Sequence, residues 1–95
     1  MAEVYLPASL VSLFAGSPRK LELEATSVGD VVSHLNARWP GMRDRLCSSN
    51  GAIRRHINVF VDGERAQAET ALRPGAVVQI IPAISGGSAR RPGGR

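Results

Sequence analysis

The chain has 95 residues, of which 43% are hydrophobic, and a single cysteine, Cys47. This length suits one domain, the apolar fraction fits a folded protein, and a lone cysteine excludes an intramolecular disulfide. The formal net charge is +4, but three basic residues (Arg90, Arg91 and Arg95) follow Gly87, so the preceding part is nearly neutral. Because only 4% of residues are aromatic as well, the composition argues against a nucleic-acid-binding surface.

The beginning of the chain, MAEVYLPASL, lacks the basic region and long apolar stretch of a signal peptide. No apolar run approaches the roughly 20 residues that a membrane-spanning helix needs. We therefore expect a cytoplasmic protein with no membrane partner.

Two early segments, AEVYLP and KLELEA, alternate apolar and polar residues, which predicts two β-strands. Gly16, Ser17 and Pro18 between them form a turn cluster. The pattern therefore predicts a β-hairpin with a short turn.

The segment TSVGDVVSHLNARWPG changes to helical spacing. Ser27 is a suitable N-cap, and Asp30 follows at the capping-box distance. The apolar residues of one helical stripe are Val28, Val31, Val32, Leu35 and Trp39. Pro40-Gly41 ends the helix, and a short helical turn over 42–46 is expected after it.

Alternation returns in INVFVDGE, which places Asn58 and Phe60 on the opposite face from Ile57, Val59 and Val61, with a turn at Asp62-Gly63. Residues 64–75 are predicted to be irregular, with a helical turn near 68–72. AVVQIIP is the last strand. Its inward residues are Val78 and Ile80, and Gln79 faces water.

The order ββαββ predicts an α+β protein of the β-grasp, ubiquitin-like type. We expect a mixed four- to five-stranded sheet with one main helix packed on one face.

Residues typical of catalysis are sparse. The chain has no phosphate-binding GxxxxGK[ST] loop and no GxSxG motif. His34 and His56 lie apart without partners at metal-ligand spacing, which favours a helix-surface role for His34. Cys47 ends an apolar segment and is interpreted as a core residue. The basic trio Arg54-Arg55-His56 is either a solvated loop or a contact for an anion or a partner.

Tyr5 and Phe60 are predicted to lie on adjacent strands, on the sheet face away from the helix. Two aromatic residues there indicate a docking patch for a partner protein. The predicted partner-binding residues are Tyr5, Phe60, Gln79 and Ile84. After Pro82 the residues are mostly small, so this segment could enter a narrow channel.

Several of these stretches together resemble the MoaD/ThiS family of ubiquitin-like sulfur carriers. They are the helix from TSVGDVV to RWPGMRDRL, the strand and turn NVFVDGE, and the final LRPGAVVQIIPAISGG. The resemblance covers residues 2–87 and is most specific over 75–87. It looks closest to the branch that serves cysteine synthesis, thio-sugars or other natural products.

The resemblance implies a carrier rather than an enzyme, with no bound cofactor or metal of its own. An adenylyltransferase of the ubiquitin-activating type would use ATP to activate the carboxylate of Gly87, and Gly86 would thread that enzyme's active site. Sulfur would then replace AMP, and a downstream synthase would accept sulfur from the thiocarboxylate.

The chain continues past Gly87 with SARRPGGR, unlike most members of that family. The resemblance implies a sulfur carrier domain over 1–87 and a flexible extension over 88–95. A JAMM-type zinc metalloprotease would remove the extension by cleaving between Gly87 and Ser88. Two alternatives stay open: either the extension is not part of the natural protein, or Gly93-Gly94 is the working terminus after loss of Arg95.

Three alternative functions also stay open. The first is the small subunit of molybdopterin synthase, and the second is a ubiquitin-like modifier joined to lysines through Gly87. The third is a binding module without terminal chemistry.

Overall fold

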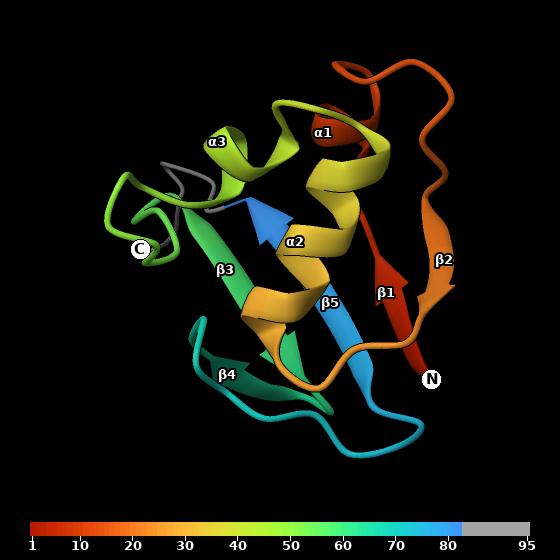
Figure 1. Cartoon of the computed structure of the whole chain (residues 1–95), viewed down its shortest axis with the longest axis vertical. Helices are drawn as coiled ribbons and strands as arrows, with labels where there is room; N and C mark the ends of the chain where they lie inside the picture. The colour runs from red at the N-terminus through yellow and green to blue at the C-terminus, as the bar shows by residue number, and fades with distance from the viewer. Residues whose placement is uncertain (83–95) are drawn as a thin grey trace, which may run out of the picture.

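The computed structural model describes residues 1–82. Their elements are β1 (Ala2–Tyr5), α1 (Ala8–Val11), β2 (Lys20–Leu23), α2 (Val28–Arg38), α3 (Met42–Leu46), β3 (Ile57–Val61), β4 (Glu64–Ala66) and β5 (Val77–Pro82). The strands form one five-stranded sheet in the order β2-β1-β5-β3-β4. The central β1–β5 pair is parallel and the other pairs are antiparallel. Helix α2 crosses one face of this sheet, which confirms the predicted mixed sheet with one main helix (Figure 1).

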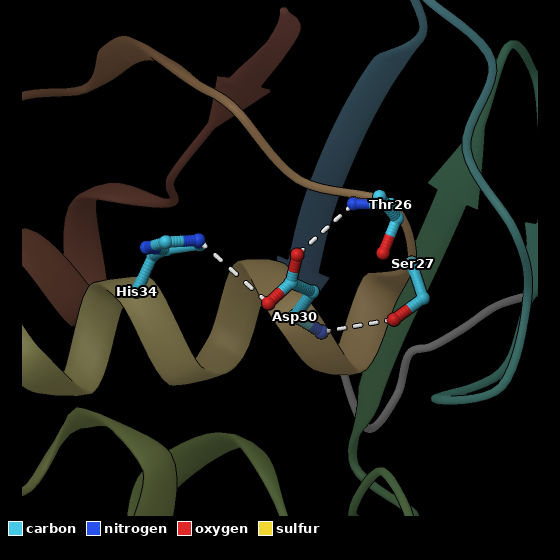
Figure 2. A network of polar contacts seen from close by, with 4 residues as sticks. All are labelled: Thr26, Ser27, Asp30 and His34. Carbon is cyan, nitrogen blue, oxygen red and sulfur yellow. Dashed lines mark hydrogen bonds and ion pairs between the residues drawn. The ribbon is translucent and has the colours of Figure 1, made fainter.

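Helix α2 begins as its sequence predicts. The Ser27 hydroxyl accepts a hydrogen bond from the Asp30 backbone N–H at 3.1 Å. In return the Asp30 carboxylate accepts the N–H of Thr26 at 3.0 Å, and His34 Nε2 lies 3.7 Å from its other oxygen (Figure 2). Side chains therefore satisfy backbone donors that a helix start leaves unpaired, and the carboxylate lies where the helix dipole favours it.

The prediction of a helical turn near 68–72 is wrong. Ala68 and Glu69 form a simple turn, and Ala71 makes an isolated bridge to Ser27. The carbonyl of Thr70 accepts the Val28 N–H at 3.0 Å, and that of Ala68 accepts the Gly29 N–H at 2.8 Å. The carbonyls of this segment accept the first N–H groups of α2 instead of N–H groups further along the segment. The segment therefore runs alongside the start of α2 and forms no helical turn.

Residues 64–75 are also less irregular than predicted, because β4 pairs with β3 through the expected turn. Asp62 and Gly63 both have positive φ, 51° and 86°. The Asp62 N–H donates to the Val77 carbonyl at 2.8 Å, and the Val77 N–H donates to the Asp62 carboxylate at 2.9 Å. Asp62 thus fixes both the turn and the start of β5.

Strands β1 and β2 pair antiparallel as predicted, with Val4 opposite Leu21. Their connection is not a short turn, however, because it contains α1. The Pro7 carbonyl accepts the N–H groups of both Leu10 and Val11 at 3.0 Å. Leu10 is buried in the core, so tertiary packing stabilises a four-residue helix that has little stability alone.

The core lies between α2 and the inner face of the sheet. Four of the five predicted stripe residues are buried: Val28, Val31, Val32 and Leu35. Trp39 is half-buried and caps the end of the helix. Val78 and Ile80 point inward and Gln79 is exposed, as predicted. No helix within residues 1–82 is both long and apolar enough to cross a bilayer.

Candidate docking face and carboxyl end

The sheet face turned away from α2 carries a row of side chains that crosses several strands. Gln79 of β5 pairs with Tyr5 of β1 on one side and with Phe60 of β3 on the other. Residues in register on neighbouring strands share a face and lie close together. The two aromatic residues are therefore not on adjacent strands as predicted, because β5 separates them. The structure nevertheless brings these three predicted partner-binding residues into one line.

A cation continues the row at each end. Lys20 of β2 pairs with Tyr5, and Arg65 of β4 pairs with Phe60. We call Lys20, Tyr5, Gln79, Phe60 and Arg65 the docking row. Sequence reasoning missed both cations, and Arg65 could be found only once β4 was recognised as a strand.

Lys20 is held in place by its neighbours on β1. Its Nζ lies 2.8 Å from Glu3 Oε2 and 5.7 Å from the centre of the Tyr5 ring. The hydrogen bond between the two charged groups lowers the pKa of Glu3 and raises the pKa of Lys20. Lys20 is exposed and Glu3 is only half-buried, so this pair orders the end of the row more than it stabilises the fold.

A cavity of about 270 Å³ adjoins the docking row at the end of β5. Tyr5 and Gln79 line it together with Ile81 and Pro82. Ile81 is 41% exposed, and among the large apolar side chains of residues 1–82 only Met1 and Leu13 are more exposed. An aromatic and apolar hollow of this kind can accept an apolar side chain of a partner protein.

Four predicted site residues lie outside the described residues: Ile84, Gly86, Gly87 and Ser88. The structure therefore leaves their roles as predictions. Within residues 1–82, β5 runs to Pro82, which lines the same cavity as Tyr5 and Gln79 of the docking row.

Cys47 is 5% exposed and belongs to the core, which confirms its interpretation from the sequence. Burial raises the pKa of its thiol, and the nearby cations Arg43 and Arg54 only partly offset this. The thiol is therefore poorly suited to act as a nucleophile. His34 is exposed on α2, as predicted. Across residues 1–82, no three His, Cys, Asp or Glu residues gather in a way that could hold a metal ion.

The model of the ThiS family matches residues 4–87. The sulfur carrier protein CysO of Mycobacterium tuberculosis (strain ATCC 25618 / H37Rv) is 32% identical over 78 residues, covering 76% of this chain and 84% of CysO. Small archaeal modifier protein 1 of Haloferax volcanii is 33% identical over 61 residues, covering 64% of this chain and 70% of that protein.

Solved structures agree with the fold. The Amycolatopsis orientalis BexX/CysO complex contains a chain that superposes with a TM-score of 0.81 at 25% identity, covering 92% of this chain and 100% of that one. Mycobacterium tuberculosis CysO gives a TM-score of 0.79 at 29% identity, with coverages of 88% and 100%. These similarities confirm the predicted β-grasp, ubiquitin-like fold.

Proposed function

The chain belongs to the ThiS family, and we propose that it carries sulfur as a thiocarboxylate on Gly87. The observation that carries this proposal is the continuous family match over residues 4–87, which ends on Gly86-Gly87. The similarity to proteins named as sulfur carriers supports it. The sulfur is destined for a small metabolite, such as cysteine or a thio-sugar, through a downstream synthase.

The proposed chemistry divides a difficult substitution into two easier ones. A carboxylate is a poor electrophile, so an adenylyltransferase of the ubiquitin-activating type first joins the Gly87 carboxylate to the α-phosphorus of ATP and releases pyrophosphate. A sulfur nucleophile then attacks the acyl carbon and AMP leaves. Gly86 and Gly87 have no side chains to obstruct a narrow active site. The partner enzyme supplies the catalysis, and the carrier acts as its co-substrate.

Gly87 is followed by Ser88 in the full chain, so its carboxyl group is held in a peptide bond. We infer that a JAMM-type zinc metalloprotease hydrolyses this bond and releases residues 88–95. Cleavage would also remove three of the twelve basic side chains. The carrier domain that remains would be nearly neutral.

The intact mass of the protein recovered from its native host tests both steps. We expect a species that ends at Gly87, together with a fraction heavier by the difference between one sulfur and one oxygen atom. Mild alkylation should modify only that heavier fraction, because a thiocarboxylate is a better nucleophile than a carboxylate. If the chain stays full-length to Arg95 while the cells demand sulfur, the carrier proposal is wrong.

The docking row is the surface on which we expect the adenylyltransferase to bind. Replacing Phe60 or Tyr5 by alanine should raise the KM for the carrier about tenfold and leave kcat nearly unchanged, because each variant removes an aromatic contact without altering Gly87. Steady-state adenylation kinetics with carrier ending at Gly87 measure both constants.

Phe14 provides a matched control, since it is also half-buried but contacts the α2–α3 junction near Gly41. Phe14→Ala should lower the melting temperature and leave the KM at its original value. Equal KM changes in all three variants would mean that lost stability, rather than lost docking, explains the effect.

A second function deserves a test because Small archaeal modifier protein 1 is among the similar proteins. If the chain is also a ubiquitin-like modifier, Gly87 would become linked to lysines of target proteins through isopeptide bonds. Mass spectrometry of proteolysed host protein would then find lysines carrying the carboxyl-terminal residues of this chain. If the thiocarboxylate is found and no such adducts are found, sulfur transfer remains the proposed function.

A further inference from the structure

Another cavity within residues 1–82 lies on the opposite face of the sheet from the docking row. Its volume is about 510 Å³. Its floor is formed by Ile57 and Val59 of β3 and by Ala66 of β4. Val59 pairs with the inward-facing Ile80 and is buried in the core, so this floor belongs to the helix side of the sheet. We call it the helix-side pocket.

Two opposing walls give the helix-side pocket its charge. One wall is the loop before β3 and carries Arg54 and Arg55, and the other contains Glu69. Arg54 Nε donates to the Asp44 carbonyl at 2.7 Å, which fixes that side chain against α3. Arg65 also borders the pocket, but its register with Phe60 directs its side chain to the outer face.

The two arginines on the loop wall have no acidic partner within residues 1–82, where the ion pairs are Lys20–Glu3 and His34–Asp30. Arg54 is half-buried and Arg55 is exposed. Arg54 Nε already donates to the Asp44 carbonyl, but the other guanidinium donors of the two arginines make no hydrogen bond within residues 1–82 and are available for an anion in planar, two-pronged geometry. Two members of the basic trio noted in the sequence therefore border a cavity, which favours the second of its two interpretations, a contact for an anion or a partner.

We propose that the helix-side pocket binds a small organic anion that has an apolar body. Its carboxylate, phosphate or sulfonate group would bond to Arg54 and Arg55, and its apolar part would cover Ile53 and Ile57. The volume falls within the range of about 300–1,000 Å³ that is typical of small-molecule sites. Ile57 pairs with Pro82, so this ligand would sit next to the end of β5. The proposal is independent of the sulfur chemistry at Gly87.

The test uses the full chain and the fluorescent probe 8-anilinonaphthalene-1-sulfonate at low ionic strength. We expect saturable binding and methyl NMR shifts at Ile53 and Ile57, with Tyr5 and Gln79 signals unchanged. Arg55→Gln should weaken binding about tenfold, because it removes a charge-assisted hydrogen bond. Arg38→Gln, which neutralises an exposed arginine of α2, should leave the affinity unchanged. Competition by inorganic phosphate or by acetate then indicates which anionic group the pocket prefers.

Glu69→Gln provides a test with the opposite sign. Removing the carboxylate from the facing wall should tighten binding of the anionic probe about threefold. Unfolding or loosening of the domain would instead change the probe signal in the same direction in both variants, and thermal melts identify such a case. Probe shifts that map to the docking row, or an Arg55→Gln variant that binds as well as the original, would overturn the proposal.

Discussion

Replacing Gly87 by tryptophan is expected to abolish adenylation while the domain remains folded. The described core residues all lie at or before Ile80, and glycine has no side chain whose packing the substitution could remove. An indole at the reacting residue would, in contrast, occupy the space through which the carboxylate must approach ATP. The loss should exceed a thousandfold in kcat/KM, which corresponds to about 4 kcal/mol of transition-state stabilisation. Pyrophosphate release with the purified partner enzyme measures it.

The variant should be made in a chain that ends at residue 87, because adenylation then does not depend on prior proteolysis. Gly87→Ala is the graded control, since one methyl group should reduce the rate far less than an indole. The full 95-residue chain is the negative control, because its Gly87 has no free carboxylate. Full activity of Gly87→Trp, or adenylation of the uncleaved chain, would show that Gly87 is not the reacting residue.

Local signals in the sequence were sufficient to predict α2 and its boundaries. Ser27 and Asp30 lie three positions apart and satisfy backbone donors by their own side chains, so the start of the helix can be read without knowing the rest of the fold. The end is equally local, because Pro40 cannot continue a helix and Gly41 adopts a φ of 100°.

The two missed elements, α1 and β4, depend on distant contacts. Helix α1 has four residues and is stabilised by burial of Leu10. Strand β4 has three residues, too few for alternation to be recognised, and is defined by its pairing with β3. Likewise, the 68–72 segment has a helical composition but serves as acceptor for the N–H groups of Val28 and Gly29. Tertiary hydrogen bonds override local preference in such segments.

The candidate site also contains residues that the sequence predicted and residues that only the structure revealed. Alternation predicted that Tyr5, Phe60 and Gln79 face away from the helix, and this is confirmed. Alternation does not give strand order, so the central position of β5 and the flanking cations Lys20 and Arg65 came only from the structure. The roles of Gly86 and Gly87 rest on family resemblance instead, because a Gly-Gly pair by itself indicates little about structure or function.

Leu35→Ala is expected to have the largest effect on stability. Leu35 is 0% exposed at the middle of the apolar stripe by which α2 packs on the sheet. Truncation removes buried methyl groups and leaves a cavity that the surrounding strands can only partly fill. Such substitutions lower the free energy of unfolding by about 2–5 kcal/mol. For a domain of this size the melting temperature should fall by roughly 10 °C or more, measured by circular dichroism.

Leu13→Ala is the control, because it also replaces a leucine by alanine but at a position that is 54% exposed. Its free energy of unfolding should change by no more than about 0.5 kcal/mol. If both variants were equally destabilised, packing of the apolar stripe of α2 would not be the main contribution to the stability of the domain. The comparison also bears on function: well below its melting temperature Leu35→Ala should still be adenylated, because its docking row and Gly87 are intact. Gly87→Trp should fail at every temperature, so lost stability and lost chemistry can be measured separately in the same assay.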